Sequence, residues 1–376
     1  MRKINMLELR KKLANYQEIF YMLFLLPMTG MTSMGLNSED RIYLYVFAVA
    51  TLFLLLKMAV TDFTWREIVI MGIFTLLLGA NFLRNGEKTL ILTAMGIFGA
   101  KNVNLDKVMK YALWEKAVLT VGTLTLVMAG VIENVGIWLI KGDDYLEIKS
   151  YGYHTPNMAY ANIFVILLLA IVVYREKIKW YVYVVATIVL YGAYKILICR
   201  TGFLLWGVLC VAILVYRIAK RFQWQKLYAM FFIPIPAVLA VVTMIIPVIA
   251  QKNEEFSIWI NRLLTGRITL VNFVYDEVWT LVLGHMPQES YDSIYFHTLF
   301  NYGWIILILC LVAYTAGMWY CNVKGQYYIT IALGVMAVYG YVELLPLSVL
   351  WNLPMLYLAQ ILFKERTVVH LSLIHI

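Results

Sequence analysis

The amino-acid sequence predicts an all-α polytopic membrane protein with about 12 transmembrane helices. Of its 376 residues, 62% are hydrophobic and only 14% are charged, and the mean hydropathy is +0.77. A water-soluble core of this length could not bury so much apolar surface, which excludes a soluble globular protein. Long apolar runs also recur along the chain between short polar segments, as expected of successive membrane spans.

The predicted spans follow one another in chain order. The first apolar run begins near Tyr16, directly after a basic segment. No small-residue cleavage site follows it, so we expect a retained span rather than a secretory signal. Further runs occupy residues 41–60, 67–83, 88–100, 112–132, 158–174, 180–199, 202–216, 227–250, 294–318, 326–343 and 347–363. The run at 88–100 is shorter than the roughly 20 residues that a helix needs to cross a bilayer.

The distribution of lysine and arginine predicts the orientation of these spans. With the N-terminus in the cytoplasm, about two-thirds of these residues fall in cytoplasmic segments, which is the bias of the positive-inside rule. The loops at 133–157 and 251–293 then lie on the outer face. The net charge of +9 does not indicate a nucleic-acid partner, because the basic residues are scattered between spans rather than gathered on one face.

The chain is predicted to form one membrane domain over residues 1–370, since no repeat, low-complexity tract or soluble domain interrupts it. The last six residues, LSLIHI, read like the translation of a sequencing-adapter end. We therefore interpret residues 371–376 as a scar, the alternative being an ordinary apolar tail. The cysteines lie in or at the ends of apolar runs without metal-ligand spacing, which predicts neither disulfides nor a metal site: Cys199, Cys210, Cys310 and Cys321.

The longest polar break, residues 251–293, is the predicted active segment. It combines anion-binding and proton-transfer groups that a mere connector does not need, namely Arg262, Arg267, His285, Glu289 and Asp292. Apolar residues at helical spacing after Thr265 predict a helix in this loop, with Arg267 in its first turn. A phosphate there would gain free backbone N–H groups and a bidentate partner. The alternative is that Arg262 and Arg267 are solvated loop arginines.

A second predicted anion site lies at the R-T-G turn between two apolar runs. Arg200 stands at this turn, at the outer membrane boundary, where exposure to lipid would cost a few kcal/mol. Lys195 adds a second cation five residues earlier. Two such cations suggest an anionic ligand, and the alternative is an arginine that snorkels from a helix end.

The predicted proton acceptor is one of His285, Asp292 and His154. His285 is preferred for its exposed Gly and Pro neighbours and its near-neutral intrinsic pKa. His154 precedes a span in the other outer loop, and a lone histidine is more often structural. Asp292 has an alternative role as the cap of the next helix, in which His297 and Asn301 share one face.

Four motifs occur in an order that resembles a known superfamily. They are H-T-P-N at 154–157, R-T-G at 200–202, T-G-R at 265–267 and D-S-x-x-x-x-x-L-x-x-Y-G-W at 292–304. Together they resemble the O-antigen ligase and Wzy-type polysaccharide polymerase superfamily, over residues 150–310. The resemblance implies a GT-C-like bacterial glycosyltransferase of the cytoplasmic membrane. Such an enzyme takes a glycan from undecaprenyl pyrophosphate on the outer leaflet, without a nucleotide sugar, metal or cofactor, and works beside a flippase and a chain-length regulator.

The resemblance also assigns roles to individual residues. The family arginines match Arg200 and Arg267, with Arg262 as a third, in binding the pyrophosphate. Family ligases show a histidine followed by a His-Asn pair in this loop, whereas here His285 is followed by Asp292 and Ser293. This departure favours a polymerase that joins lipid-linked repeat units. The alternatives are a ligase with another acceptor, and a flippase or transporter, which should show two related halves that the sequence lacks.

Overall fold

The computed structural model is predominantly helical and describes residues 10, 12–141, 144–263, 282–284 and 292–363. Its first half contains α2 (Gln17–Ser33), α3 (Arg41–Val60), α4 (Trp65–Asn85), α5 (Thr89–Gly99), α6 (Leu105–Met128), β1 (Gly136–Lys141), β2 (Asp144–Lys149) and α7 (Pro156–Tyr174). Its second half contains η1 (Arg175–Lys177), α8 (Trp180–Leu197), α9 (Arg200–Arg221), α10 (Gln225–Met230), α11 (Ile235–Lys252), α12 (Glu254–Leu263), α14 (Ile294–Val323), α15 (Tyr327–Tyr339), η3 (Leu345–Leu347), η4 (Leu353–Leu358) and α16 (Ala359–Leu362).

Each predicted apolar run has a helical counterpart, but not every counterpart is a full membrane span. Among the described residues, seven helical stretches are long and apolar enough to cross a membrane. They are Arg41–Val60, Trp65–Asn85, Pro156–Lys177, Trp180–Leu197, Arg200–Arg221, Gln225–Lys252 and Ile294–Val323. The short run at 88–100 forms the 11-residue α5, and α15 has 13 residues. The helices agree with the expectation of an all-α membrane protein, and in the described part of the chain seven of the predicted spans have the length and composition to cross a membrane.

The outward faces of these helices are apolar. Between 17% and 56% of each candidate span is buried inside the protein. Large side chains such as Leu76, Ile188 and Leu204 are 65% to 73% exposed. Such faces would be costly in water and are favourable in hydrocarbon, as expected of helices that border lipid.

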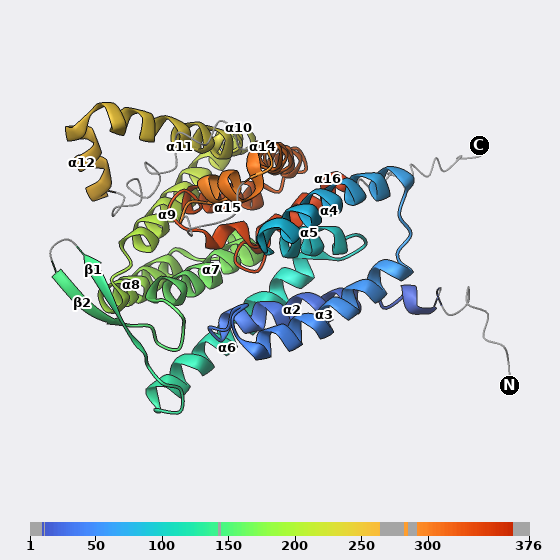
Figure 1. Cartoon of the computed structure of the whole chain (residues 1–376), viewed down its shortest axis with the longest axis horizontal. Helices are drawn as coiled ribbons and strands as arrows, with labels where there is room; N and C mark the ends of the chain where they lie inside the picture. The colour runs from blue at the N-terminus through green and yellow to red at the C-terminus, as the bar shows by residue number, and fades with distance from the viewer. Residues whose placement is uncertain (1–9, 11, 142–143, 264–281, 285–291, 364–376) are drawn as a thin grey trace.

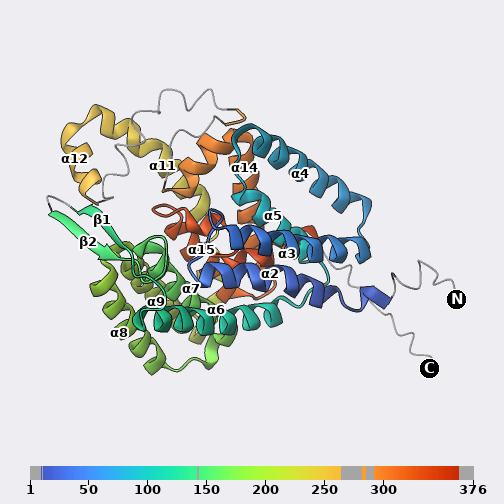
Figure 2. The same ribbon diagram turned by 60° about the horizontal axis from the view of Figure 1, so that its bottom comes forward.

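A β-hairpin stands at one end of the helices. β1 and β2 pair in antiparallel register, from Gly136 opposite Lys149 to Lys141 opposite Asp144. The hairpin lies within the loop predicted at 133–157, where the sequence analysis expected no strands. Figures 1 and 2 both place it, with α12, at the opposite end from the start of α2 and the connection between α3 and α4. We call these the hairpin end and the terminal end.

Helix α14 is interrupted inside a continuous apolar run of the sequence. Gly303 has a φ of 86° and a ψ of 174° inside the helix, a conformation that favours glycine. Gly284, with a φ of 75°, packs against this break so closely that a Cβ on Gly303 would lie 2.4 Å from the backbone N of Gly284. The part of α14 before the break, about two and a half turns, is thus a separate short helix that ends against the 282–284 segment.

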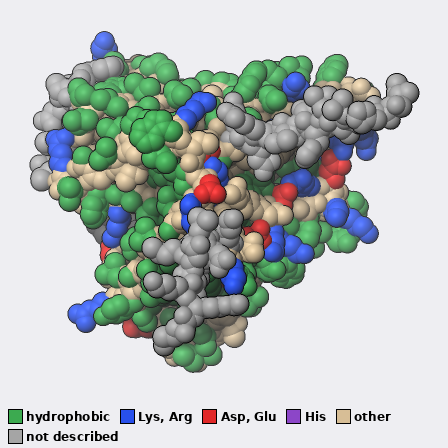
Figure 3. Space-filling view, turned by 90° about the vertical axis from the view of Figure 1, so that its right-hand side faces the viewer, with side chains coloured by type: hydrophobic (Ala, Val, Ile, Leu, Met, Phe, Trp, Pro, Cys, Tyr) green, Lys and Arg blue, Asp and Glu red, His purple; other side chains and the backbone are tan. Residues whose placement is uncertain are grey.

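Most charged side chains of the helix connections meet at the terminal end. Figure 3 looks onto this end, where Lys and Arg side chains lie beside Asp and Glu. The ion pairs there join Arg10 to Asp62, Lys101 to Glu67, Lys107 to Glu18, Arg175 to Asp106, and Lys220 to Glu176. These ion pairs therefore connect several of the described segments that were predicted to be cytoplasmic.

Candidate functional site

The hairpin end brings His154 against a carboxylate. His154 Nε2 lies 3.1 Å from Asp40 Oδ2, although 114 residues separate them in the sequence. Asp40 is the residue before α3, and it also accepts a hydrogen bond from the backbone N–H of Asn37 at 2.8 Å. This backbone hydrogen bond and the neighbouring His154 lower the pKa of Asp40, despite partial burial. A carboxylate that holds one ring nitrogen of a histidine fixes the orientation of the ring, as a general base requires.

The residues that follow His154 build the start of α7. Thr155 caps the helix, its hydroxyl accepting a hydrogen bond from Met158 N, and Pro156 occupies the first helical position. In the first turn, Asn157 Nδ2 donates to Glu343 Oε1 at 3.0 Å. Glu343 comes from the segment after α15, and only 8% of it is exposed. The H-T-P-N motif is thus a helix-start motif that joins two distant segments at the hairpin end.

Arg200 lies at the same end, as the first residue of α9. Helix α8 ends at Leu197, Ile198 adopts a φ of 51°, and α9 begins two residues later. Gly202 packs against Tyr160 of α7 so closely that a Cβ would lie 2.3 Å from the ring. Tyr160 lies in the second turn of α7, which begins two residues after His154, so this contact places the start of α9 against the first turns of α7. Arg200 is exposed at the resulting edge.

Lys195 has a different setting from Arg200. It is exposed in the last turn of α8, and its Nζ lies 5.4 Å from the ring centroid of Tyr191 and 5.9 Å from that of Tyr194. A cation at a helix C-terminus above two aromatic rings is already well stabilised. The structure therefore gives Lys195 local partners in addition to the ligand role that the sequence suggested.

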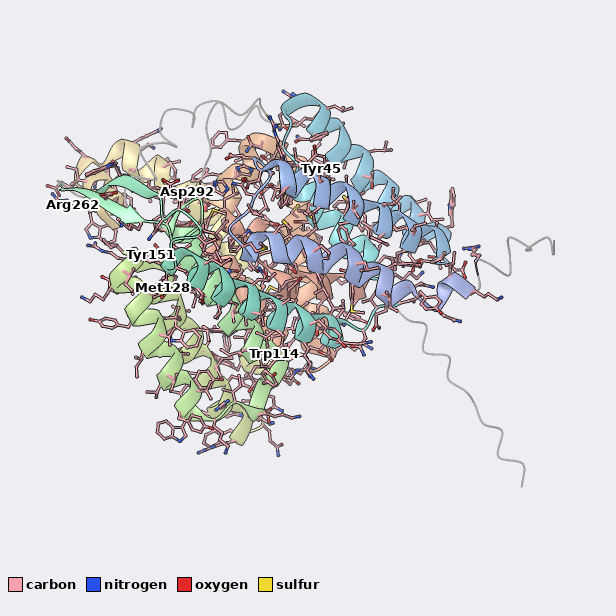
Figure 4. The ribbon with its side chains drawn as sticks, turned by 90° about the horizontal axis from the view of Figure 1, so that it is seen from below. Tyr45, Trp114, Met128, Tyr151, Arg262 and Asp292 are labelled. Atoms are coloured by element: carbon pink, nitrogen blue, oxygen red, sulfur yellow. The ribbon has the colours of Figure 1, made fainter. Side chains whose placement is uncertain are left out.

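Only part of the predicted active loop, residues 251–293, lies within the described residues. Arg262 is exposed in the last turn of α12, so the loop is helical over Glu254–Leu263. Asp292 is exposed next to Ser293, which occupies the cap position of α14 without a side-chain cap bond. Figure 4 shows Arg262 beside the hairpin tip and Asp292 closer to the helices. Arg267 and His285 lie outside the described residues, as does the helix predicted after Thr265.

A buried polar network lies beneath His154. Lys116, in the middle of α6, is completely buried, and its Nζ donates to Thr32 Oγ1 at 3.1 Å, Ser33 Oγ at 3.3 Å and Asn162 Oδ1 at 3.4 Å. Asn162 Nδ2 donates in turn to Tyr153 OH at 2.9 Å. Tyr153 OH donates to the backbone oxygen of Ser33 at 2.7 Å. The network ties α2, α6 and α7 to the residue that precedes His154.

The sequence analysis missed this network, although a signal was present. Glu115 and Lys116 are the charged residues of the apolar run at 112–132. Ionisable residues inside a membrane span usually face the protein interior and mark function. Asp40 and Glu343 had no such signal, because their partners are distant in the sequence.

The expected face of α14 is confirmed. Asn301 Nδ2 lies 3.0 Å from Nδ1 and 3.1 Å from Nε2 of His297, and both residues are buried. His297 Nε2 is 3.7 Å from Glu87 Oε2. The backbone oxygen of Asn301 accepts hydrogen bonds from Asn81 and Asn85 of α4 at 2.9 and 2.5 Å. These bonds satisfy a carbonyl that the break at Gly303 leaves without a helical partner, so this cluster has a structural role.

Comparisons with protein-family models, with curated proteins and with solved structures find no match. Within the described ranges, no group of three or more His, Cys, Asp or Glu side chains could hold a metal ion. The described cysteines are free thiols.

The polar network predicts that Lys116 fixes the segment before His154. Replacing Lys116 with Met removes the donor shared by Thr32, Ser33 and Asn162. Amide hydrogen exchange in peptides that contain Ser33 and Tyr153 should rise about tenfold, the factor that corresponds to a loss of ~1.4 kcal/mol. The matched control is Lys110→Met, an exposed position of the same helix, which should leave exchange unchanged. Unaltered exchange in Lys116→Met would mean that the network does not hold this segment.

Proposed function

We propose that this protein polymerises oligosaccharide repeat units carried on undecaprenyl pyrophosphate, at its hairpin end, on the outer face of a bacterial cytoplasmic membrane. The observation that carries the proposal is the Asp40–His154 pair just before α7, together with the arginine-bearing start of α9 that packs on the first turns of the same helix. The histidine–carboxylate pair suits the removal of a proton. The arginine suits the stabilisation of negative charge that develops on a phosphate. The order of the H-T-P-N and R-T-G motifs agrees with the resemblance to the Wzy-type polymerases.

The proposed reaction transfers the growing glycan to the next repeat unit. The acceptor hydroxyl of a lipid-linked unit loses its proton to His154, whose ring Asp40 orients. The hydroxyl oxygen bonds to the anomeric carbon of the donor glycan as the bond from that carbon to the pyrophosphate oxygen breaks. Undecaprenyl pyrophosphate leaves with the bond electrons, and arginine stabilises the charge that develops on it.

The geometry around His154 supports this residue as the acceptor of the proton. Its carboxylate partner is in place at 3.1 Å, and the buried network around Lys116 holds the preceding residue. A catalytic base needs such a fixed position, because small displacements from the reacting geometry are costly in rate. Arg200 is our main pyrophosphate ligand, with Arg262 and Arg267 contributed by the loop.

We propose further that the terminal end faces the cytoplasm. The basic residues of the helix connections gather there, among them Lys57, Lys101, Lys107, Arg175 and Lys220, as the positive-inside rule requires. The helices α2, α5, α6 and α15, together with the η4–α16 segment, complete a twelve-segment, GT-C-like arrangement in this proposal. A lipid-linked substrate then reaches the hairpin end from the outer leaflet with its carrier still in the bilayer.

Variants at the Asp40–His154 pair and at Arg200 test the proposed chemistry. His154→Ala should reduce the rate of polymer formation from purified lipid-linked repeat units by about 100-fold or more, the usual contribution of a general base. Asp40→Asn should also reduce this rate, while its exposed neighbour Glu39→Gln should not.

Arg200→Lys keeps the positive charge but loses the bidentate fork, so most of the polymerisation activity should be lost. Arg221→Lys, at the other end of α9, should keep this activity. Full activity in His154→Ala and Arg200→Lys would refute these roles.

A matched pair of cysteines tests the proposed orientation. In a background without Cys199, Cys210, Cys310 and Cys321, Glu133→Cys at the hairpin end should react with an impermeant thiol reagent added to intact cells. Lys177→Cys at the terminal end should react only after the membrane is opened. Both positions are exposed on the protein. The reverse pattern would place the proposed active site in the cytoplasm and contradict an outer-leaflet substrate.

A further inference from the structure

An apolar groove with a cavity volume of about 410 Å³ contains neither Asp40 nor His154 in its lining. It is partly open to the surface and is bordered by α4, α5, α14, and the η4–α16 segment. Its volume falls within the roughly 300 to 1,000 Å³ typical of small-molecule sites. The lining is almost wholly hydrophobic, with side chains such as Phe74, Leu78, Leu90 and Phe98. The groove therefore suits a hydrocarbon chain.

The length of the groove matches one leaflet of a bilayer. Along α4 it extends from Arg66 to Leu78. These positions are 12 residues apart, and at 1.5 Å per residue the groove is roughly 18 Å long. One half of the hydrocarbon core measures about 15 Å. A lipid tail could thus follow the groove from the membrane surface at the terminal end to near the middle of the bilayer.

The mouth of the groove at the terminal end is positively charged. Arg66 is the one charged residue among the side chains that line the groove, and it is exposed. The carboxylate of the next residue, Glu67, is paired with Lys101 at 2.5 Å. The positive charge of Arg66 at the mouth therefore remains for an anion.

The backbone at the mouth also favours an anion. Arg66 lies in the first turn of the 21-residue α4, where the helix dipole is positive. A guanidinium in this position is unfavourable by itself and becomes favourable when a phosphate joins it. Trp65, which is 77% exposed, stands next to it, as interfacial tryptophans do at the level of lipid headgroups.

We propose that this groove binds one acyl chain of an anionic phospholipid, whose phosphate lies at Arg66 at the terminal end of the molecule. The occupant is a lipid of the leaflet at the terminal end. It is thus separate from the substrate proposed above, whose head group lies at the hairpin end. The inference does not depend on the proposed catalytic activity, and its test requires no polysaccharide.

The test uses the full chain, purified and reconstituted in phosphatidylcholine vesicles. Phosphatidylglycerol with a photoactivatable acyl chain is the probe, and phosphatidylcholine with the same chain is the neutral reference. After illumination, mass spectrometry maps the labelled peptides. We expect peptides of α4, α5 and α14 to be labelled by the anionic probe about fivefold more than by the neutral probe, the factor for ~1 kcal/mol of attraction to one arginine at a membrane surface.

Two variants and two controls identify the parts of the site. Arg66→Gln should reduce anionic labelling to the neutral level without changing neutral labelling, whereas Arg221→Gln, an exposed arginine at the same end, should behave as the unmodified protein. Ala94→Phe fills the groove and should abolish labelling by both probes. Ala48→Phe, on the exposed face of α3, should not.

Two results would overturn the proposal. One is equal labelling of the groove by both probes in the unmodified protein, which would make it a site for any acyl chain. The other is an anionic excess that persists in Arg66→Gln. If Arg66→Gln does not fold, the comparison of the two probes on the unmodified protein and on Ala94→Phe still decides the outcome.

Discussion

The hydrogen bonds around Lys116 and Asn162 are the interaction on which the hairpin end depends. In hydrocarbon, a buried ammonium or amide group has no water to replace a lost partner, so its partners must come from neighbouring helices. Here they come from α2, α6 and α7, and Tyr153 connects them to the loop that carries His154. The position of a surface histidine is therefore set by a lysine deep between helices.

Much of the helical arrangement could be predicted from composition and hydrophobic runs. The run at 41–60 coincides with α3, and the run at 180–199 with α8. The hairpin could not be predicted, because its strands are short and carry charged residues. The break at Gly303 could not be predicted either, since its conformation is imposed by Gly284, which is distant in the sequence. The run at 347–363 looks like a span, but Pro354 begins a 3₁₀ segment there, and only Ala359–Leu362 is α-helical.

The sequence could predict which motif residues belong to the candidate site, but not which residues contact them. The sequence singled out His154 and Arg200 because of their places at the ends of apolar runs. It could not find Asp40, since nothing local links that carboxylate to a histidine 114 residues away. It preferred His285, which lies outside the described residues. The proposed reaction uses His154 instead, because the carboxylate of Asp40 gives that ring a fixed orientation.

The two ends of the molecule therefore have different chemistry, with a histidine–carboxylate pair at one and clustered cations at the other. We propose that the hairpin end polymerises lipid-linked repeat units. The most direct measurement is the length of the glycans on undecaprenyl pyrophosphate in cells that lack this protein. We predict that single repeat units accumulate and that long polymer disappears. Long polymer retained on the lipid carrier would contradict polymerisation and identify a ligase instead.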